Sequence, residues 1–65
     1  MGKREITDKR VRAIVTSIHG FVYYAIELPV YEGNRVLFTG YPAGGNPRGR
    51  GSCEIEYREV DEVRP

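Results

Sequence analysis

This chain of 65 residues has one histidine and one cysteine, His19 and Cys53, which are the conventional general base and the thiol nucleophile of enzymes. Such catalysis needs nucleophile, base and orienting group within hydrogen-bond reach of one another. His19 precedes Gly20 in a pattern typical of a turn, and Cys53 starts a strand pattern that predicts an inward, small apolar role. Glu54 and Glu56 share a strand face, where carboxylates are usually solvated. We therefore expect no enzyme activity.

Metal and nucleotide chemistry are disfavoured by the same composition. One histidine and one cysteine cannot supply the four ligands of a structural zinc site within one chain. The glycine-rich segment 40–52, GYPAGGNPRGRGS, lacks the G-K-[ST] ending of a phosphate-binding P-loop. We expect no metal and no cofactor. A single cysteine, a polar N-terminus and no long apolar run predict a cytoplasmic protein with a reduced thiol and no membrane contact.

The arginines of segment 40–52 are the residues best suited to binding chemistry. Arg48 and Arg50 alternate with glycines, so their guanidinium groups stand on a backbone that can approach a phosphate closely. Lys9 and Arg10 add basic charge near the N-terminus, while the C-terminal segment is acidic and the net charge is only +1. These four side chains are candidate phosphate contacts. A solvated loop and a solvated tail are the alternative.

Four segments with strand patterns must position these residues. The apolar run Phe21–Tyr31, FVYYAIELPVY, is predicted as the central strand, with Arg10–Ile18 and Arg35–Tyr41 as its neighbours. Cys53–Val60 alternates apolar with charged residues and is predicted as a fourth strand. Segment 40–52 has too many glycines and prolines for a regular element and is expected to be a long loop, either disordered or functional.

The first turn is expected at His19-Gly20, where glycine supplies the positive φ of a type I′ hairpin. This two-residue turn places Thr16 opposite Tyr23 and directs alternate side chains of the central strand inward. The predicted core face consists of Val11, Ala13, Val15, Tyr24, Ile26, Leu28, Val36 and Phe38.

The second turn is open to two registers. A two-residue loop at 33–34 pairs Val30 with Leu37, whereas a three-residue loop pairs Val30 with Val36. We prefer the three-residue loop, because it joins two apolar side chains on the predicted core face. Pro29 cannot donate to a strand ladder, so we expect there either a bulge or a bend at which the strand changes partners.

The opposite face of this sheet gathers apolar side chains that the predicted core does not bury, namely Ile14, Ile18, Phe21 and Tyr23. Three interpretations remain open for this face. The sheet could curl so far that both faces are partly buried, or the face could be a protein or self-association interface. Alternatively, the two aromatic residues could stack on nucleic-acid bases, which requires the arginine loop to lie beside them.

The length and strand count predict one all-β domain. In strand count and in the closing V-x-x-V-R-P of residues 60–65, the chain looks loosely like the SH3-like small barrels of the Tudor and KOW group, a resemblance of architecture. We predict a small SH3-like barrel of four to five antiparallel strands in residues 10–65, with a long Gly/Pro/Arg loop between strands 3 and 4. A flexible basic segment is expected over residues 1–9.

Two non-catalytic functions follow from these surfaces. The first is a nucleic-acid-binding module, for DNA or RNA. Its candidate residues, for phosphate contact and base stacking, are Lys9, Arg10, Phe21, Tyr23, Arg48 and Arg50. The alternative is a protein-interaction module, which could be a homodimer, an adaptor or a small inhibitor of a larger assembly. Its candidate interface residues are Ile14, Ile18, Phe21 and Tyr23.

Overall fold

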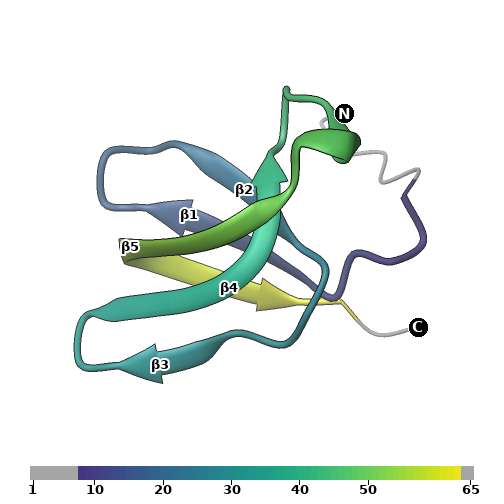
Figure 1. The fold of residues 1–65 in the computed structure, drawn as a ribbon. Helices are drawn as coiled ribbons and strands as arrows, with labels where there is room; N and C mark the ends of the chain where they lie inside the picture. Colours follow the sequence, from purple (N-terminus) through teal and green to yellow (C-terminus); the bar gives the residue numbers. More distant parts are fainter. Residues whose placement is uncertain (1–7, 64–65) are drawn as a thin grey trace.

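The computed structural model describes residues 8–63, in which the chain is all-β apart from one short 3-10 helix (Figure 1). The predicted fold class is therefore confirmed. In chain order, the elements are β1 Ala13–Ser17, β2 Val22–Ala25, β3 Val30–Glu32, β4 Arg35–Pro42, the 3-10 helix η1 Pro47–Gly49, and β5 Gly51–Glu62.

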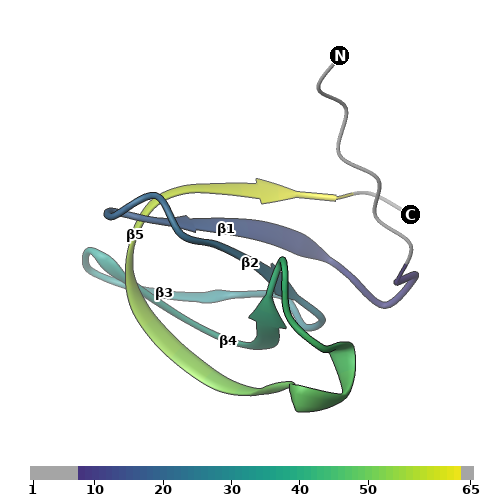
Figure 2. The same ribbon diagram turned by 90° about the horizontal axis from the view of Figure 1, so that it is seen from above.

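Four of the five strands close into an antiparallel barrel. The sheet order is β2-β1-β5-β4-β3, and an additional pairing of β2 with β4 joins β1, β2, β4 and β5 into a ring. β3 is the extra strand. It and β2 pair with different parts of β4, β2 with residues 40–42 and β3 with residues 35–37. Figure 2 shows the strands wrapped around a common interior. The predicted small barrel is confirmed.

The apolar run 21–31 is two strands, so the prediction of one continuous central strand is wrong. β2 ends at Ala25 and β3 begins at Val30, and the bend between them contains the buried Pro29. β2 lies between β1 and β4, whereas β3 pairs, in the described part of the chain, with β4 alone. Because proline cannot donate to a ladder, the chain bends there and changes partners, which was one of the two alternatives expected at this position.

The β1–β2 hairpin is one residue out of the predicted register. Val15, rather than Thr16, pairs with Tyr23, so the loop holds the three residues 18–20. A slip of one residue reverses the face on which every side chain lies. Tyr23 therefore packs against the core, with its ring centroid 6.0 Å from that of Phe38, and the prediction that it faces outward is wrong.

A buried serine determines the length of this loop. The hydroxyl oxygen of Ser17 accepts the backbone N–H of His19 at 3.2 Å and that of Phe21 at 3.0 Å. Gly20 donates its N–H to the Ser17 carbonyl and adopts a φ of +88°, which glycine reaches without steric cost. The chain therefore reverses over three residues instead of two.

The β3–β4 hairpin adopts the two-residue loop, so the preferred three-residue register is wrong and its alternative is correct. Val30 pairs with Leu37, and Gly33 takes a φ of +63° at the first loop position, as a type II′ turn requires. Val30 and Leu37 consequently share the outer face of the barrel. Leu28, predicted in the core, is 55% exposed, and that prediction is wrong.

The core is small and lies inside the ring. Tyr24 and Ile26, which were predicted to belong to it, are only half-buried. Five of the eight predicted core residues are confirmed as buried. The buried apolar residues are Val11, Ala13, Val15, Ala25, Val36, Phe38 and Tyr41.

β5 keeps the predicted alternation through its first half. Cys53, Ile55 and Tyr57 pack against the core, as expected. A bulge in the β1–β5 ladder then shifts the alternation by one residue, so Val60 also faces inward. β5 is therefore longer than the predicted strand 53–60. Its residues 51–56 pair with β4, and its residues 57–62 pair with β1.

Candidate binding surfaces

Arg10, a predicted phosphate contact, is engaged by a carboxylate of its own chain. Its Nε and Nη2 lie 2.9 and 2.8 Å from the two carboxylate oxygens of Asp8. Asp8 also accepts the Arg10 backbone N–H at 3.0 Å and the Tyr41 hydroxyl at 2.9 Å. Hydrogen bonds from Arg10 hold the pKa of Asp8 well below its usual range, so both groups are charged at neutral pH and offset each other. A phosphate must compete with Asp8 for this guanidinium.

The other predicted phosphate contacts are exposed. Arg48 lies in η1, whose first turn is capped by the Asn46 side chain accepting the Arg48 N–H at 2.9 Å, and Arg50 follows directly. This short helix corrects the expectation that segment 40–52 holds no regular element. Within residues 8–63, Lys9, Arg48 and Arg50 form no ion pair. Figures 1 and 2 place η1 and the chain entering β1 on the same side of the barrel.

Segment 40–52 begins beside β2, where the Ala43 N–H donates to the Val22 carbonyl, but its arginines do not lie beside the turn of the β1–β2 hairpin. Both views show η1 and the turn of this hairpin on opposite sides of the molecule (Figures 1 and 2). Phe21 is 63% exposed in the hairpin loop, whereas Tyr23 packs inward against Phe38. The condition that base stacking required, a basic loop next to exposed aromatic residues, is therefore not met in this fold.

The predicted four-residue apolar face reduces to two exposed side chains. Ile18 is 47% exposed and lies with Phe21 at the β1–β2 loop. Ile14 is half-buried on β1. Because Tyr23 faces the core, it does not share a surface with them. Ile18 and Phe21 are called the hairpin pair below.

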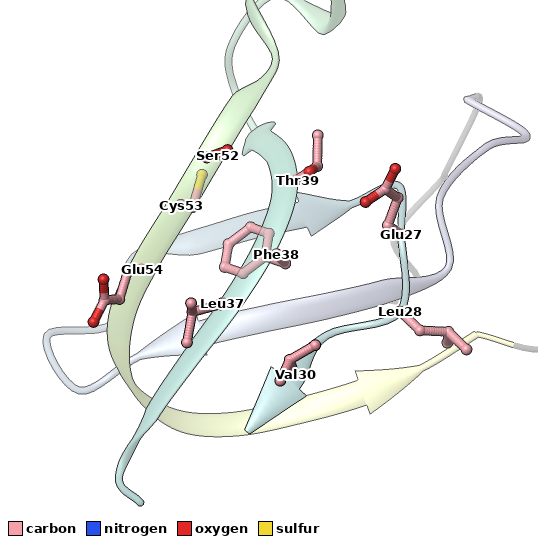
Figure 3. Close-up of a pocket in the computed structure, with 9 residues that line it drawn as sticks. All are labelled: Glu27, Leu28, Val30, Leu37, Phe38, Thr39, Ser52, Cys53 and Glu54. Atoms are coloured by element: carbon pink, nitrogen blue, oxygen red, sulfur yellow. The ribbon is translucent and has the colours of Figure 1, made fainter. Parts of the chain in front are cut away.

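A groove on the outer face of the β3–β4–β5 part of the sheet was not predicted. It has a volume of about 420 Å³ and exposes Leu28 and Val30, which are 55% and 58% accessible, beside Leu37 (Figure 3). Val30 and Leu37, a cross-strand pair, form its apolar floor and Leu28 borders it, and no described element covers them. We call this feature the β4 groove. Its lining residues are Glu27, Leu28, Val30, Leu37, Phe38, Thr39, Ser52, Cys53 and Glu54.

The rim of the β4 groove carries negative charge. Glu27 and Glu54 stand at its two sides, on the bend after β2 and on β5 (Figure 3). Arg35 reaches Glu54 with its Nε 3.1 Å from Oε2, in a pair that is about half-exposed at both ends. Glu27 has no ion-pair partner within residues 8–63. The groove therefore suits an apolar group accompanied by a positive charge.

The signal that could have found this groove lies in the second turn. The Gly-Asn loop at 33–34 permits the two-residue register, which places Val30 outside beside Leu37. The three-residue register was preferred because it pairs two apolar side chains on the core face. It predicts that Val30 faces inward, so this groove was not predicted. Glycine at the first loop position is the feature that favours the type II′ geometry found here.

Cys53 lines the groove edge and contacts the core. Its Sγ lies 3.6 Å from the Gly51 carbonyl oxygen. Burial raises the pKa of the thiol, so Cys53 is protonated at neutral pH and a poor nucleophile. His19 occupies the exposed β1–β2 loop. Across residues 8–63 there is no group of three or more His, Cys, Asp or Glu side chains placed to hold a metal ion.

Comparison with known proteins identifies no relative of this chain, so its function must be inferred from the fold and from these surfaces. No protein-family model, no curated protein and no solved structure matches the chain. In the part of the chain that the structure describes, no helix has the length and apolar character to cross a membrane.

Proposed function

We propose that this chain is a non-catalytic protein-interaction module, and that its β4 groove receives a segment of a partner protein. The observation that carries the proposal is the exposure of Leu28 and Val30 beside Leu37 in a hollow of about 420 Å³. Exposed apolar side chains that line one concavity mark binding surfaces more often than scattered ones do. A volume of this size accepts two or three side chains of an extended segment.

Charge favours a basic partner segment. Glu27 and Glu54 flank the apolar floor, and among residues 8–63 only Glu54 has a basic partner, Arg35. A lysine or arginine next to an apolar residue would place its charge at this rim while the apolar side chain covers Val30. The same carboxylates oppose a phosphate backbone. We therefore rank protein binding at this groove above nucleic-acid binding. The cytoplasmic location expected from the sequence belongs to the same proposal.

Selection from a random peptide library displayed on phage tests this proposal. We expect the selected peptides to share an apolar residue adjacent to lysine or arginine. Val30→Lys should weaken their binding at least about tenfold, because it fills the floor and adds a like charge. Phe21→Ser is the matched control, since it removes an exposed apolar side chain from a different surface, and it should leave binding unchanged. Selected peptides without an apolar–basic pair, or binding lost in the control alone, would contradict the proposal.

A second candidate, nucleic-acid binding, is favoured by one observation. Lys9, Arg48 and Arg50 are exposed and have no carboxylate partner within residues 8–63. They belong to the chain that enters β1 and to η1 with its C-cap, two segments on the same side of the barrel. Three phosphate contacts would give affinity for a duplex a slope of about −3 against salt on logarithmic axes. Stacking by Phe21 and Tyr23 does not belong to this candidate, since Phe21 follows the hairpin turn on the side opposite to η1 and Tyr23 packs against Phe38.

Fluorescence anisotropy with labelled single- and double-stranded oligonucleotides, over a series of salt concentrations, tests the second candidate. The double variant Arg48→Gln/Arg50→Gln should reduce the slope by about two. Arg58→Gln, an exposed arginine of β5, is the control and should not change it. Affinity that is equal at low and moderate salt rules the candidate out.

A further inference from the structure

The first half of β5 has an edge that no strand within residues 8–63 covers. Residues 51–56 pair with β4 on one side, and β1 pairs only with residues 57–62. Within the described chain, β5 contacts no other strand. Figure 2 shows this green half of β5 running along the outside of the barrel. The five residues Gly51–Ile55 therefore form an open strand edge.

The backbone groups on this edge can be assigned from one hydrogen bond. The Ile18 N–H donates to the Glu56 carbonyl at 3.1 Å, on the side of β5 that faces away from β4. In an antiparallel ladder, every second residue directs its N–H and C=O to the same side. Ser52 and Glu54 therefore present theirs to the open edge. Exposed edges of this kind recruit further strands unless they are very short or blocked.

β3 is also an edge strand, but it is protected against strand addition, whereas the open edge of β5 is not. β3 has three residues, and Pro29 precedes it directly. Short strands flanked by proline are poor templates for strand addition. The open edge of β5 is longer and contains no proline. Its only charged residue is Glu54, which is already paired with Arg35.

We propose that this edge pairs with the same edge of a second copy of the chain, in an antiparallel two-fold arrangement. One register uses all five residues of both edges, and it places Ser52 of each copy opposite Glu54 of the other. No like charges then face each other, and a serine hydroxyl meets a carboxylate on each side of the axis. Cys53 of the two copies meets at the axis. Each Ser52–Glu54 pair exchanges two backbone hydrogen bonds.

Complementary charge and the hairpin pair support a second copy as the occupant. In this register Arg50 of one copy arrives near Glu56 of the other. Because Ile18 of the same copy already bonds the Glu56 carbonyl, only the side chains of Arg50 and Glu56 would meet, on both sides of the axis. Ile18, 47% exposed, adjoins Glu56 at the end of the open edge. The chain of the second copy that precedes Gly51 would therefore arrive beside Ile18 and cover it. A chain of this size also gains stability from association. Ser52, Cys53 and Glu54 also line the β4 groove, so a second copy paired to this edge would border the groove on its β5 side.

Sedimentation equilibrium of the full chain under reducing conditions tests the pairing. Ser52 is exposed, and its N–H lies outside the β4 ladder, so substitutions there should preserve the barrel. Ser52→Lys places a lysine opposite Glu54 twice per dimer and should tighten dimerisation about 2- to 30-fold, and Ser52→Glu should weaken it by a similar factor. Ser52→Pro removes a required donor and should give a monomer.

Controls separate this register from other modes of association. Glu59→Gln changes the charge equally on the covered half of β5 and should leave the dimer unchanged. Facing residues of a non-hydrogen-bonded pair have Cα atoms about 4.5 Å apart, so a mixed sample of labelled and unlabelled chains should show a contact between the two Cys53 α hydrogens by isotope-filtered NMR. A monomer at about millimolar concentration, a dimer insensitive to Ser52→Pro, or Ser52→Lys weakening the dimer would each overturn the proposal.

Discussion

Asp8 illustrates how one short-range contact changes the functional interpretation of a residue. Arg10 stands in a basic N-terminal sequence and was predicted to bind phosphate, yet Asp8 two residues earlier holds its guanidinium at two points. The Tyr41 hydroxyl ties the same carboxylate to β4. The pair therefore fastens the chain that enters β1 to the barrel. Nothing in the spacing of basic residues distinguishes such an anchoring arginine from a free one.

The pH dependence of stability tests this anchor. Hydrogen bonds from Arg10, and then from the Tyr41 hydroxyl, lower the pKa of Asp8 below the ordinary value of 3.8. A depressed pKa adds stability that is fully present above the ordinary value and is lost as pH falls toward the folded-state value. The difference in unfolding free energy between wild type and Asp8→Asn should thus be constant from about pH 5 to 8 and shrink below pH 3.8. Urea titrations at several pH values measure it, and a difference that widens on acidification would contradict the anchor.

At the scale of elements, strand patterns were predicted better than their registers. The alternation of Cys53, Ile55 and Tyr57 identified an inward face, because period-two patterning depends only on local sequence. Hairpin registers depend on loop geometry. In the first hairpin, the Ser17 hydroxyl adds one loop residue, and in the second, Gly33 favours the shorter loop. Each error moved a side chain to the opposite face, Tyr23 in one case and Val30 in the other.

Closure of the barrel depends on a close approach between β2 and β4. A Cβ at Gly40 would overlap the Tyr24 carbonyl, so only glycine allows these strands to pair. We expect Gly40→Ala to lower the unfolding free energy by about 3 kcal/mol or more, because backbone atoms must shift. Gly44→Ala, whose Cβ would meet open space, is the control and should change it by less than about 0.5 kcal/mol. Equal effects of the two substitutions in urea unfolding would contradict the observed closure.

At the scale of the whole molecule, the sequence predicted the barrel but not the arrangement of its surfaces. Strand count and turn spacing indicate the architecture. The long-range pairing of β2 with β4 decides which loops lie together, and no local pattern encodes it. That pairing joins the start of segment 40–52 to β2, while η1 lies on the side opposite to the β1–β2 turn. Leu28 and Val30, on either side of the bend at Pro29, are exposed. Candidate residues could therefore be named from the sequence, while their grouping into sites could not.

Chemical-shift mapping on the isotope-labelled chain, titrated with a peptide that carries an apolar residue next to lysine, tests the central claim most directly. The β4 groove, the hairpin pair and the η1 side are separate surfaces, so one spectrum discriminates among them. We expect the largest shifts at Leu28, Val30 and Leu37, with smaller ones at Glu27 and Glu54. Largest shifts at Ile18 and Phe21, or around η1, would contradict the assignment of the groove as the partner site.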